Sequence, residues 1–302
     1  MRYRKLGKTG LQVSMVGIGT WQFGGEWGKQ FTQDEVSRIL GRGLELGINL
    51  IDTAECYGDH LSEALIGQAV HGHRQEWIIA TKFGHRFVGH LHREELWSPD
   101  DVRRQLEDSL RALRTDYIDL YQFHSGSDAA FDQTSLWEML GRQVEAGKIR
   151  HLGLSISSRR ENFYQAARAA EIGASVIQVV YNRLDRGPEA RVLPACQEQD
   201  LGVLARVPLA SGLLSGKYRP GATFTQENDV RANRDAAEIA AQLQQVDGIR
   251  QHELPAGVEM AAWALAWCLK HPAVTAVIPG CKTVAQLEAN ASAADLELGG
   301  TR

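Results

Sequence analysis

Four titratable residues of different types follow short apolar runs in the first half of the chain. Asp52 ends the run NLID and Tyr57 follows five residues later, whereas Lys82 ends WIIATK and His124 ends IDLYQFH. A phenol with a pKa near 10 is a poor acid at pH 7, and a neighbouring ammonium group lowers that pKa. A buried lysine needs a counter-ion, which Asp52 can supply. With an imidazole donor, this set suits protonation of a carbonyl oxygen. None of the four can carry a hydride, so a reduction also needs a cofactor.

Each of these residues also has an ordinary structural explanation. An aspartate after a strand can cap a helix, and a lysine at a strand end can extend into solvent. A histidine or tyrosine can pack in a core with its polar atoms satisfied. The catalytic interpretation depends on the joint occurrence of the four, in this order, after consecutive apolar runs.

Eight strand-length apolar runs, separated by helix-like stretches, would position these residues. They cover residues 14–20, 49–53, 77–82, 118–124, 149–155, 176–182, 202–209 and 274–280. Such alternation predicts a parallel sheet covered by helices on both faces. Eight units in about 250 residues favour an α/β fold closed into a (β/α)8 TIM barrel. We therefore expect residues 1–302 to form one domain, with its active site at the carboxyl ends of the strands.

A doubly wound open sheet is the main alternative fold. It would carry a glycine fingerprint for phosphate after its first strand. Gly17 and Gly19 do lie in the first run, but Gln22 occupies the third glycine position. The barrel is therefore preferred. We also expect an N-terminal β-hairpin turning at residues 7–10, helices that begin after Thr32 and Ser98, and a functional or mobile loop within 211–256.

The composition excludes several classes of protein. A net charge of −4, from 33 basic and 37 acidic residues, argues against nucleic-acid and membrane partners. The four cysteines form no C-x-x-C pair, and the N-terminus has no apolar signal region. These features predict a soluble, cytoplasmic protein. His85, His90 and His92 follow the third run, but no acid follows the last run, so we predict a substrate-side loop and no metal site.

The sequence resembles the aldo-keto reductases along nearly its whole length. The segments that carry the resemblance are RKLGKTGLQVS, GIGTW, IDTAECYG, ATKFG, DLYQFH, GLSIS, VIQVVYN, PLASGLLSGKY and VIPGCKT. The resemblance implies a (β/α)8 barrel that reversibly reduces an aldehyde or ketone to an alcohol with a nicotinamide cofactor. It also implies that Tyr57 is the general acid, that Lys82 and Asp52 tune it, and that His124 orients the substrate.

The same resemblance implies a set of cofactor residues near the ends of the runs. Ser155 and Gln178 would hold the nicotinamide amide, and Lys282 is the reason to prefer NADPH over NADH, which is also possible. Loops after the seventh and eighth barrel strands commonly bind phosphate, and helix N-termini favour anions. Arg206 departs from the aromatic residue that often stacks on nicotinamide. The remaining residues of this set are Thr20, Trp21, Asp52, Pro208, Leu209, Ser211, Lys217, Gly280, Thr283, Gln286 and Asn290.

A function of another class stays open. PLASGLLSGKY and PGCKT resemble the family branch that includes the potassium-channel β subunits, which suggests an NADPH-binding redox sensor with little turnover. The expected partner is otherwise a small carbonyl or alcohol substrate. The loops at 22–31, 84–97, 125–134 and 211–235 would shape its pocket, but their sequences identify neither the substrate nor the oligomeric state.

Overall fold

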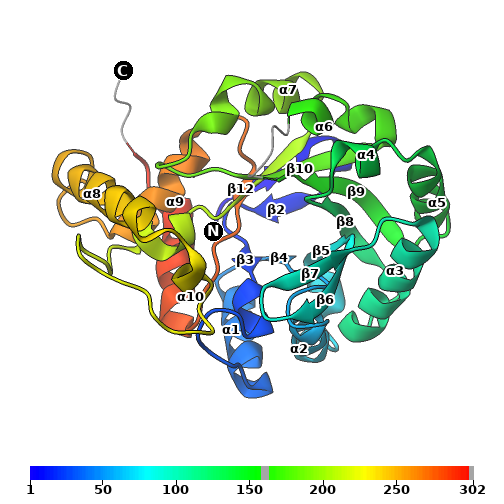
Figure 1. Ribbon diagram of the computed structural model, residues 1–302, viewed down its shortest axis with the longest axis horizontal. Helices are drawn as coiled ribbons and strands as arrows, with labels where there is room; N and C mark the ends of the chain where they lie inside the picture. Colours follow the sequence, from blue (N-terminus) through cyan, green and yellow to red (C-terminus); the bar gives the residue numbers. More distant parts are fainter. Residues whose placement is uncertain (158–162, 299–302) are drawn as a thin grey trace.

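Eight parallel strands form the centre of the molecule in this computed structural model, which describes residues 1–157 and 163–298. The sheet closes because backbone hydrogen bonds of 2.8 and 3.0 Å join Gly17 to Val277 and Gly19 to Pro279. The closed barrel confirms the predicted fold and its eight apolar runs (Figure 1). In sheet order the strands are β12 (Ala276–Val277), β11 (Gly202–Arg206), β10 (Ala174–Val180), β9 (Ile149–Ser155), β8 (Ile118–His124), β5 (Ile78–Phe83), β4 (Leu50–Asp52) and β3 (Ile18–Gly19).

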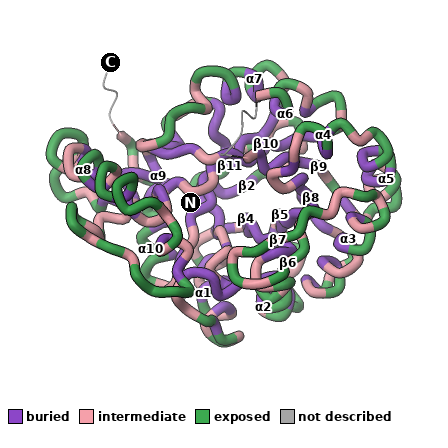
Figure 2. The backbone as a smooth tube through the Cα atoms, in the orientation of Figure 1, coloured by how far each residue is buried: buried purple, intermediate pink, exposed green. Residues whose placement is uncertain are grey.

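Helices surround the barrel and turn their polar faces outward, so burial is concentrated at the strands (Figure 2). Thr32 and Glu35 form the predicted capping box of α1, and Ser98 caps α3 as expected. Within the described residues, no helix combines the length and apolarity needed to cross a membrane. The helices are α1 (Gln33–Glu45), α2 (Leu61–Ala69), α3 (Pro99–Leu113), α4 (Asp128–Phe131), α5 (Thr134–Glu145), α6 (Phe163–Ala167), α7 (Val192–Glu198), α8 (Ala236–His252), α9 (Met260–Lys270) and α10 (Val284–Ala291).

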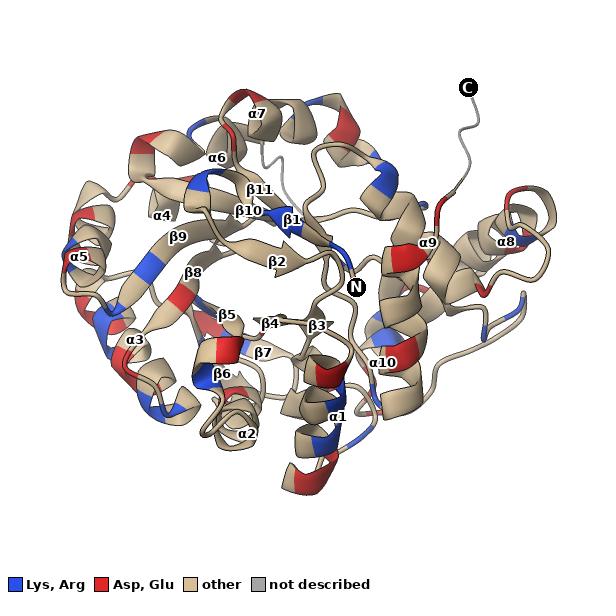
Figure 3. Ribbon diagram, turned by 180° about the vertical axis from the view of Figure 1, so that it is seen from behind, with Lys and Arg blue, Asp and Glu red and all other residues tan. Residues whose placement is uncertain are grey.

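An N-terminal hairpin, formed by β1 (Tyr3–Lys5) and β2 (Gln12–Ser14), closes one end of the barrel as predicted (Figure 3). Leu6 and Val13 are fully buried and pack against inward-facing apolar side chains of the barrel strands. At Gly7 a Cβ atom would lie 2.2 Å from the backbone nitrogen of Gly202. A larger residue cannot fit there unless the backbone moves, so the hairpin sits tightly on the barrel.

Two segments between barrel strands contain structure that was not predicted. The stretch after β5 forms the hairpin of β6 (His85–Gly89) and β7 (His92–Glu95). The prediction of a functional or mobile loop within residues 211–256 was wrong in part, because this segment contains the 17-residue helix α8. The sequence does hold a signal for α8. Asp235 caps it, and its buried residues recur at helical spacing, but alanine and glutamine between them weaken the apolar pattern.

Candidate active site

A buried ion pair joins the ends of β4 and β5. The ammonium nitrogen Nζ of Lys82 lies 2.8 Å from Oδ2 of Asp52, 2.6 Å from the carbonyl oxygen of Thr53 and 3.3 Å from the hydroxyl of Tyr57. The side chains of Lys82 and Asp52 are only 1% and 5% exposed. The three predicted residues therefore meet at one point on the carboxyl-terminal side of the sheet, with the cation between the carboxylate and the phenol.

Local sequence fixes where these groups lie. Asp52 is the last residue of β4, and Lys82 lies two residues beyond Ala80, which pairs with Asp52 in the sheet. Side chains two residues apart on a strand share a face, so Lys82 continues the inner face of β5. Tyr57 lies in the turn that follows β4, and that turn packs closely on Gly24. A Cβ atom at Gly24 would lie 2.6 Å from the carbonyl carbon of Tyr57, so a glycine is needed there.

The second carboxylate oxygen of Asp52 is held from the opposite side of the barrel. Its Oδ1 accepts hydrogen bonds from Nε2 of Gln178 at 2.6 Å and from Nε2 of Gln122 at 3.2 Å. The Ser155 hydroxyl in turn donates to Oε1 of Gln178 at 3.1 Å. Sequence reasoning missed Gln122, although strand alternation places it on the same face as His124. The network orients the carboxylate toward Lys82.

Burial and charge act on the pKa values of this cluster in opposite directions. Burial lowers the pKa of Lys82, but Asp52 and Tyr57 outweigh burial, so the net pKa is raised and the amine stays charged. Burial also raises the pKa of Tyr57, to about 12, although the Lys82 cation opposes that rise. The net value therefore lies above that of a free phenol, contrary to the lowered pKa expected from sequence. Lys82 offsets only part of the effect of burial.

His124 ends β8 beside the phenol. The rings of His124 and Tyr57 lie 6.4 Å apart and nearly perpendicular, and Nδ1 of His124 lies 3.8 Å from the sulfur of Cys56. Burial is the largest cause that lowers the pKa of His124 well below its ordinary value, and the nearby groups His85 and Lys82 act in the same direction. The imidazole is therefore neutral at pH 7 and can donate one hydrogen bond.

A second buried carboxylate anchors the loop beside the phenol. The ring of Trp21 stacks on Tyr57 at a centroid distance of 5.9 Å. The indole nitrogen of Trp21 and a guanidinium nitrogen of Arg93 donate to Oε2 of Glu26, at 2.7 and 2.6 Å. The backbone nitrogen of Leu91 donates to its Oε1 at 2.8 Å. Glu26 thus connects the β6–β7 hairpin to Trp21, whose ring stacks on Tyr57. No motif marked this residue in the sequence.

The predicted cofactor residue Arg206 lies at the end of β11. Arg206 ends β11, and one guanidinium nitrogen donates to the carbonyl oxygen of Ile156 at 3.1 Å. Its Nε is buried and has no hydrogen-bond partner among the described residues. Tyr181, the residue that follows β10, is buried against Trp267 and donates its hydroxyl to Glu189 at 2.8 Å. Arg206, and not an aromatic ring, therefore occupies the end of β11.

A basic region lies where β12 leads into α10. Burial is the largest cause that lowers the pKa of Lys282, Asp229 opposes it, and the cations Arg231, Lys217 and Lys29 lower it further. In the described part of the chain, Lys217 and Lys282 take part in no ion pair, whereas Lys29 and Arg231 do. Lys217 and Lys282 are therefore available to bind a phosphate group, and the donor set fits the phosphates of a nucleotide.

The loops after β3 and β11 meet beside this basic region. Two backbone hydrogen bonds of 2.9 and 3.2 Å join residues 26–28 to residues 228–230. Nζ of Lys282 donates to the carbonyl oxygen of Trp27. The long segment after β11 therefore reaches across the rim to the loop that contains Glu26.

The other predicted cofactor residues lie along the same side of the barrel. Thr20 donates its hydroxyl to the carbonyl oxygen of Asp52 at 2.9 Å. Thr283 caps α10 by accepting a hydrogen bond from the backbone of Gln286, and Asn290 lies 3.5 Å from the carbonyl oxygen of Gly280. The segment that follows β11 contributes Pro208, Leu209 and Ser211. Most of the set therefore surrounds the ends of β11 and β12.

Comparison with known proteins identifies the family. The model of the aldo/keto reductase family matches residues 15–299. The chain belongs to this family. An uncharacterized oxidoreductase of Bacillus subtilis, YqkF, is 32% identical over 98% of this chain and 92% of its own. A probable voltage-gated potassium channel subunit beta of Arabidopsis thaliana is 30% identical over the same shares. The structure of aldo-keto reductase AKR11C1 from Bacillus halodurans (holo form) superposes with a TM-score of 0.82 at 31% identity, covering 98% of this chain and 92% of that one.

Family membership indicates an oxidoreductase. Members of this family generally use a nicotinamide cofactor and act on small carbonyl compounds. It confirms the resemblance found in the sequence, including the branch with channel β subunits.

The Glu26 anchor leads to a prediction for stability. Burial raises the pKa of Glu26, but hydrogen bonds from Arg93, Leu91 and Trp21 outweigh burial, so the net pKa lies below its ordinary value. Glu26→Gln leaves a largely buried guanidinium without its anion, and we expect a loss of about 1–3 kcal/mol in the free energy of unfolding at pH 7. A carboxyl with a lowered folded pKa stabilises above its unfolded pKa of about 4.3 and loses this effect as the pH falls through the folded value. Urea denaturation should therefore give converging stabilities for the two proteins at acid pH.

Glu94→Gln is the matched control on the same hairpin. It breaks the pair of Arg86 and Glu94, whose side chains are 60% and 47% exposed, and should change stability by less than about 1 kcal/mol. Equal losses in the two variants, or a Glu26→Gln loss that persists in acid, would contradict the anchoring role.

Proposed function

We propose that the protein is an NADPH-dependent reductase of aldehydes or ketones that can also run in reverse as an alcohol dehydrogenase. The observation that carries the proposal is the buried Lys82 ammonium, 2.8 Å from Asp52 and 3.3 Å from the Tyr57 hydroxyl. This arrangement suits transfer of a proton from a phenol that would otherwise be a very weak acid. The four free, buried cysteines fit a reducing compartment, and we propose a cytoplasmic location.

In the proposed mechanism, Tyr57 supplies the proton. When bound, the nicotinamide cofactor supplies the hydride. The Tyr57 hydroxyl donates its proton to the substrate oxygen as that oxygen acquires negative charge. The phenolate left behind is buried and costly, but it lies beside the Lys82 cation, which lowers the cost. Asp52 keeps that cation charged throughout. His124 is neutral, so it donates a hydrogen bond to the substrate oxygen without competing as the proton source.

The charges at the rim support a proposal for where the cofactor binds. Lys282 and Lys217 would bind the nucleotide phosphates, and Lys282 is the candidate for the 2′-phosphate that distinguishes NADPH from NADH. Ser155 and Gln178 would hold the nicotinamide amide. Gln178 accepts a hydrogen bond from Ser155 and donates one to Asp52, which would link cofactor binding to the carboxylate. Arg206 would lie at the nicotinamide end, where its buried Nε needs an acceptor.

A second candidate function has one specific observation in its favour. Channel β subunits from two plants are 30% identical to this chain over 98% of its length. A redox-sensing subunit would bind NADPH tightly and turn over slowly. Titration of cofactor binding, alongside turnover on a panel that includes sugars, pyridoxal and simple aromatic aldehydes, separates the two functions. Tight binding with negligible turnover on every carbonyl would favour the sensor.

Tyr57→Phe tests the proton donor. Removal of the hydroxyl eliminates general acid catalysis, which typically contributes about 10²–10⁴-fold. We expect kcat to fall by at least about 100-fold, while the Kd for NADPH, measured by fluorescence titration, changes little. Tyr117→Phe is a control because that ring stacks on Arg74 at 4.2 Å, on another part of the barrel. Wild-type turnover in Tyr57→Phe would show that another group donates the proton.

Lys282→Ala tests the preference for NADPH. Hydrogen bonds to charged groups contribute about 1.5–3 kcal/mol, so the KM for NADPH should rise by roughly 10- to 150-fold. The KM for NADH should change little, because NADH has no 2′-phosphate. Lys270→Ala, an exposed lysine at the end of α9, serves as the control. Equal increases for both cofactors would contradict contact with the 2′-phosphate.

A further inference from the structure

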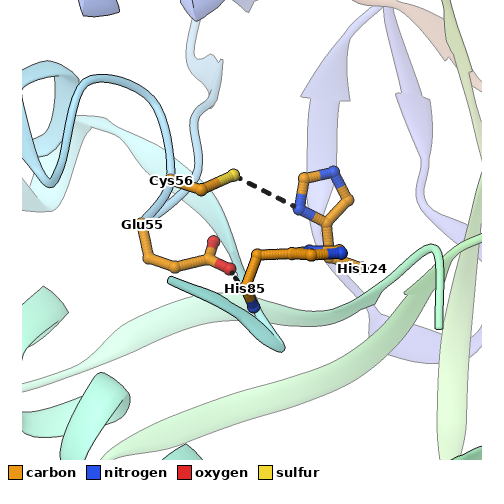
Figure 4. A group of neighbouring side chains, drawn as sticks. All are labelled: Glu55, Cys56, His85 and His124. Carbon is orange, nitrogen blue, oxygen red and sulfur yellow. Dashed lines mark hydrogen bonds between the residues drawn. The ribbon is translucent and has the colours of Figure 1, made fainter. Parts of the chain in front are cut away.

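Glu55, Cys56, His85 and His124 converge beside the Tyr57 turn, although three different segments contribute them (Figure 4). Each side chain offers one ligand atom, and the four atoms lie within 4.8 Å of one another. The set contains a thiol, two imidazoles and a carboxyl, the ligand types that bind zinc in proteins. A zinc ion in a tetrahedral site lies about 2.0–2.3 Å from each ligand atom. The four ligand atoms would therefore have to move only slightly to bind one ion.

Two side chains of this cluster each carry a buried polar atom that has no hydrogen-bond partner among the described residues. Oε2 of Glu55 and Nδ1 of His85 are both buried, and neither forms a hydrogen bond within the described part of the chain. Glu55 is only 2% exposed, and its other oxygen accepts from the backbone nitrogen of His85 at 3.0 Å. Buried polar atoms are nearly always satisfied, so two unpartnered atoms on neighbouring residues of one ligand-like cluster point to a ligand.

Charges around the cluster permit a divalent cation. A thiolate at Cys56 and a carboxylate at Glu55 would neutralise it. The nearest cations are already paired, since Arg93 bonds to Glu26 at 2.6 Å and Lys82 to Asp52 at 2.8 Å.

Other charged groups also face these side chains. Burial is the largest cause that raises the pKa of Glu55 and lowers the pKa of His85 and of His124. In addition, Glu63 raises the pKa of Glu55, Glu95 opposes the fall at His85, and Arg206 lowers the pKa of His124. Burial raises the pKa of the Cys56 thiol well above its ordinary value, Glu55 raises it further, and Arg93 opposes this rise only in part. A thiolate at Cys56 would therefore form only together with a bound cation.

We propose that Glu55, Cys56, His85 and His124 form a binding site for a zinc-class divalent cation, and that its occupation inhibits the reductase. The inhibitory part rests on the proposed function. His124 would be a metal ligand and no longer free to orient a carbonyl, and movement of Cys56 toward the metal would shift the neighbouring Tyr57. The sequence spacing did not reveal this set, because His90 and His92, the neighbours of His85 in the chain, are exposed and lie outside the cluster.

Binding is tested with untagged protein, titrated with cobalt(II) and zinc(II) in the presence of a non-chelating reductant. We expect one equivalent of cobalt to bind with a thiolate charge-transfer band and the visible spectrum of a tetrahedral site. Cys56→Ser should abolish the band, and His85→Gln should weaken zinc binding by at least about 10- to 100-fold, the loss seen when only an outer partner of a ligand is removed. No binding, or binding with the same affinity and spectrum in both variants, would overturn the proposal.

Matched controls separate this site from unspecific binding. Cys196→Ser removes another buried thiol, in α7, and His92→Gln removes an exposed imidazole from the same hairpin. Both should retain the cobalt spectrum and the affinity of the wild type. Loss of binding in either control would assign the metal to a different place.

Inhibition is measured separately from binding. Zinc should lower turnover with a midpoint that matches its Kd, and His85→Gln should shift that midpoint to higher zinc by the same factor. Zinc binding without inhibition would refute the inhibitory role, but it would still support the metal site. If the protein reduces no carbonyl, the proposed function fails, whereas the spectroscopic test of the site still gives its own answer.

Discussion

A charged amine buried inside a barrel is the constraint on which the rest of the site depends. Lys82 is 0% exposed, and a cation without compensation there would lose its proton or destabilise the fold. Asp52 provides the opposite charge, and Gln122, Gln178 and the backbone of Thr53 complete the hydrogen bonds. Asp52 and Thr53 lie at the end of β4, whereas Lys82, Gln122 and Gln178 come from β5, β8 and β10, so the complete set of hydrogen bonds forms only when these strands are assembled.

The fold serves this requirement at several levels. The carboxyl ends of β4 and β5 bring the two charges together, and the close packing of Gly24 on the turn after β4 brings Tyr57 to the cation. The N-terminal hairpin fills the opposite end of the barrel with apolar side chains. The pKa of Tyr57, raised to about 12 by burial against the effect of Lys82, shows what the cation does: it limits the cost of a buried phenolate.

Sequence reasoning found the barrel, its capped helices and the meeting of Asp52, Tyr57 and Lys82, because strand ends and apolar runs are local properties. It could not give the net pKa of Tyr57, since burial is a property of the assembled fold. Glu26 and the cluster of Glu55, Cys56, His85 and His124 also escaped, because their partners come from distant loops with no characteristic spacing. Gln122 and α8 are different cases. Strand alternation and an aspartate cap did indicate them, but stronger neighbouring signals obscured both.

A double-mutant cycle at Asp52 and Lys82 tests the central claim most directly. Single-turnover rates of hydride transfer would be measured for Asp52→Asn, Lys82→Met and the double variant, with unfolding free energies for each. If the two groups act as one ion pair, each single change removes the effect of the pair, so the double variant should be no slower and no less stable than the worse single variant. Strictly additive losses in rate and stability would contradict the account, because they would mean that Asp52 and Lys82 act independently.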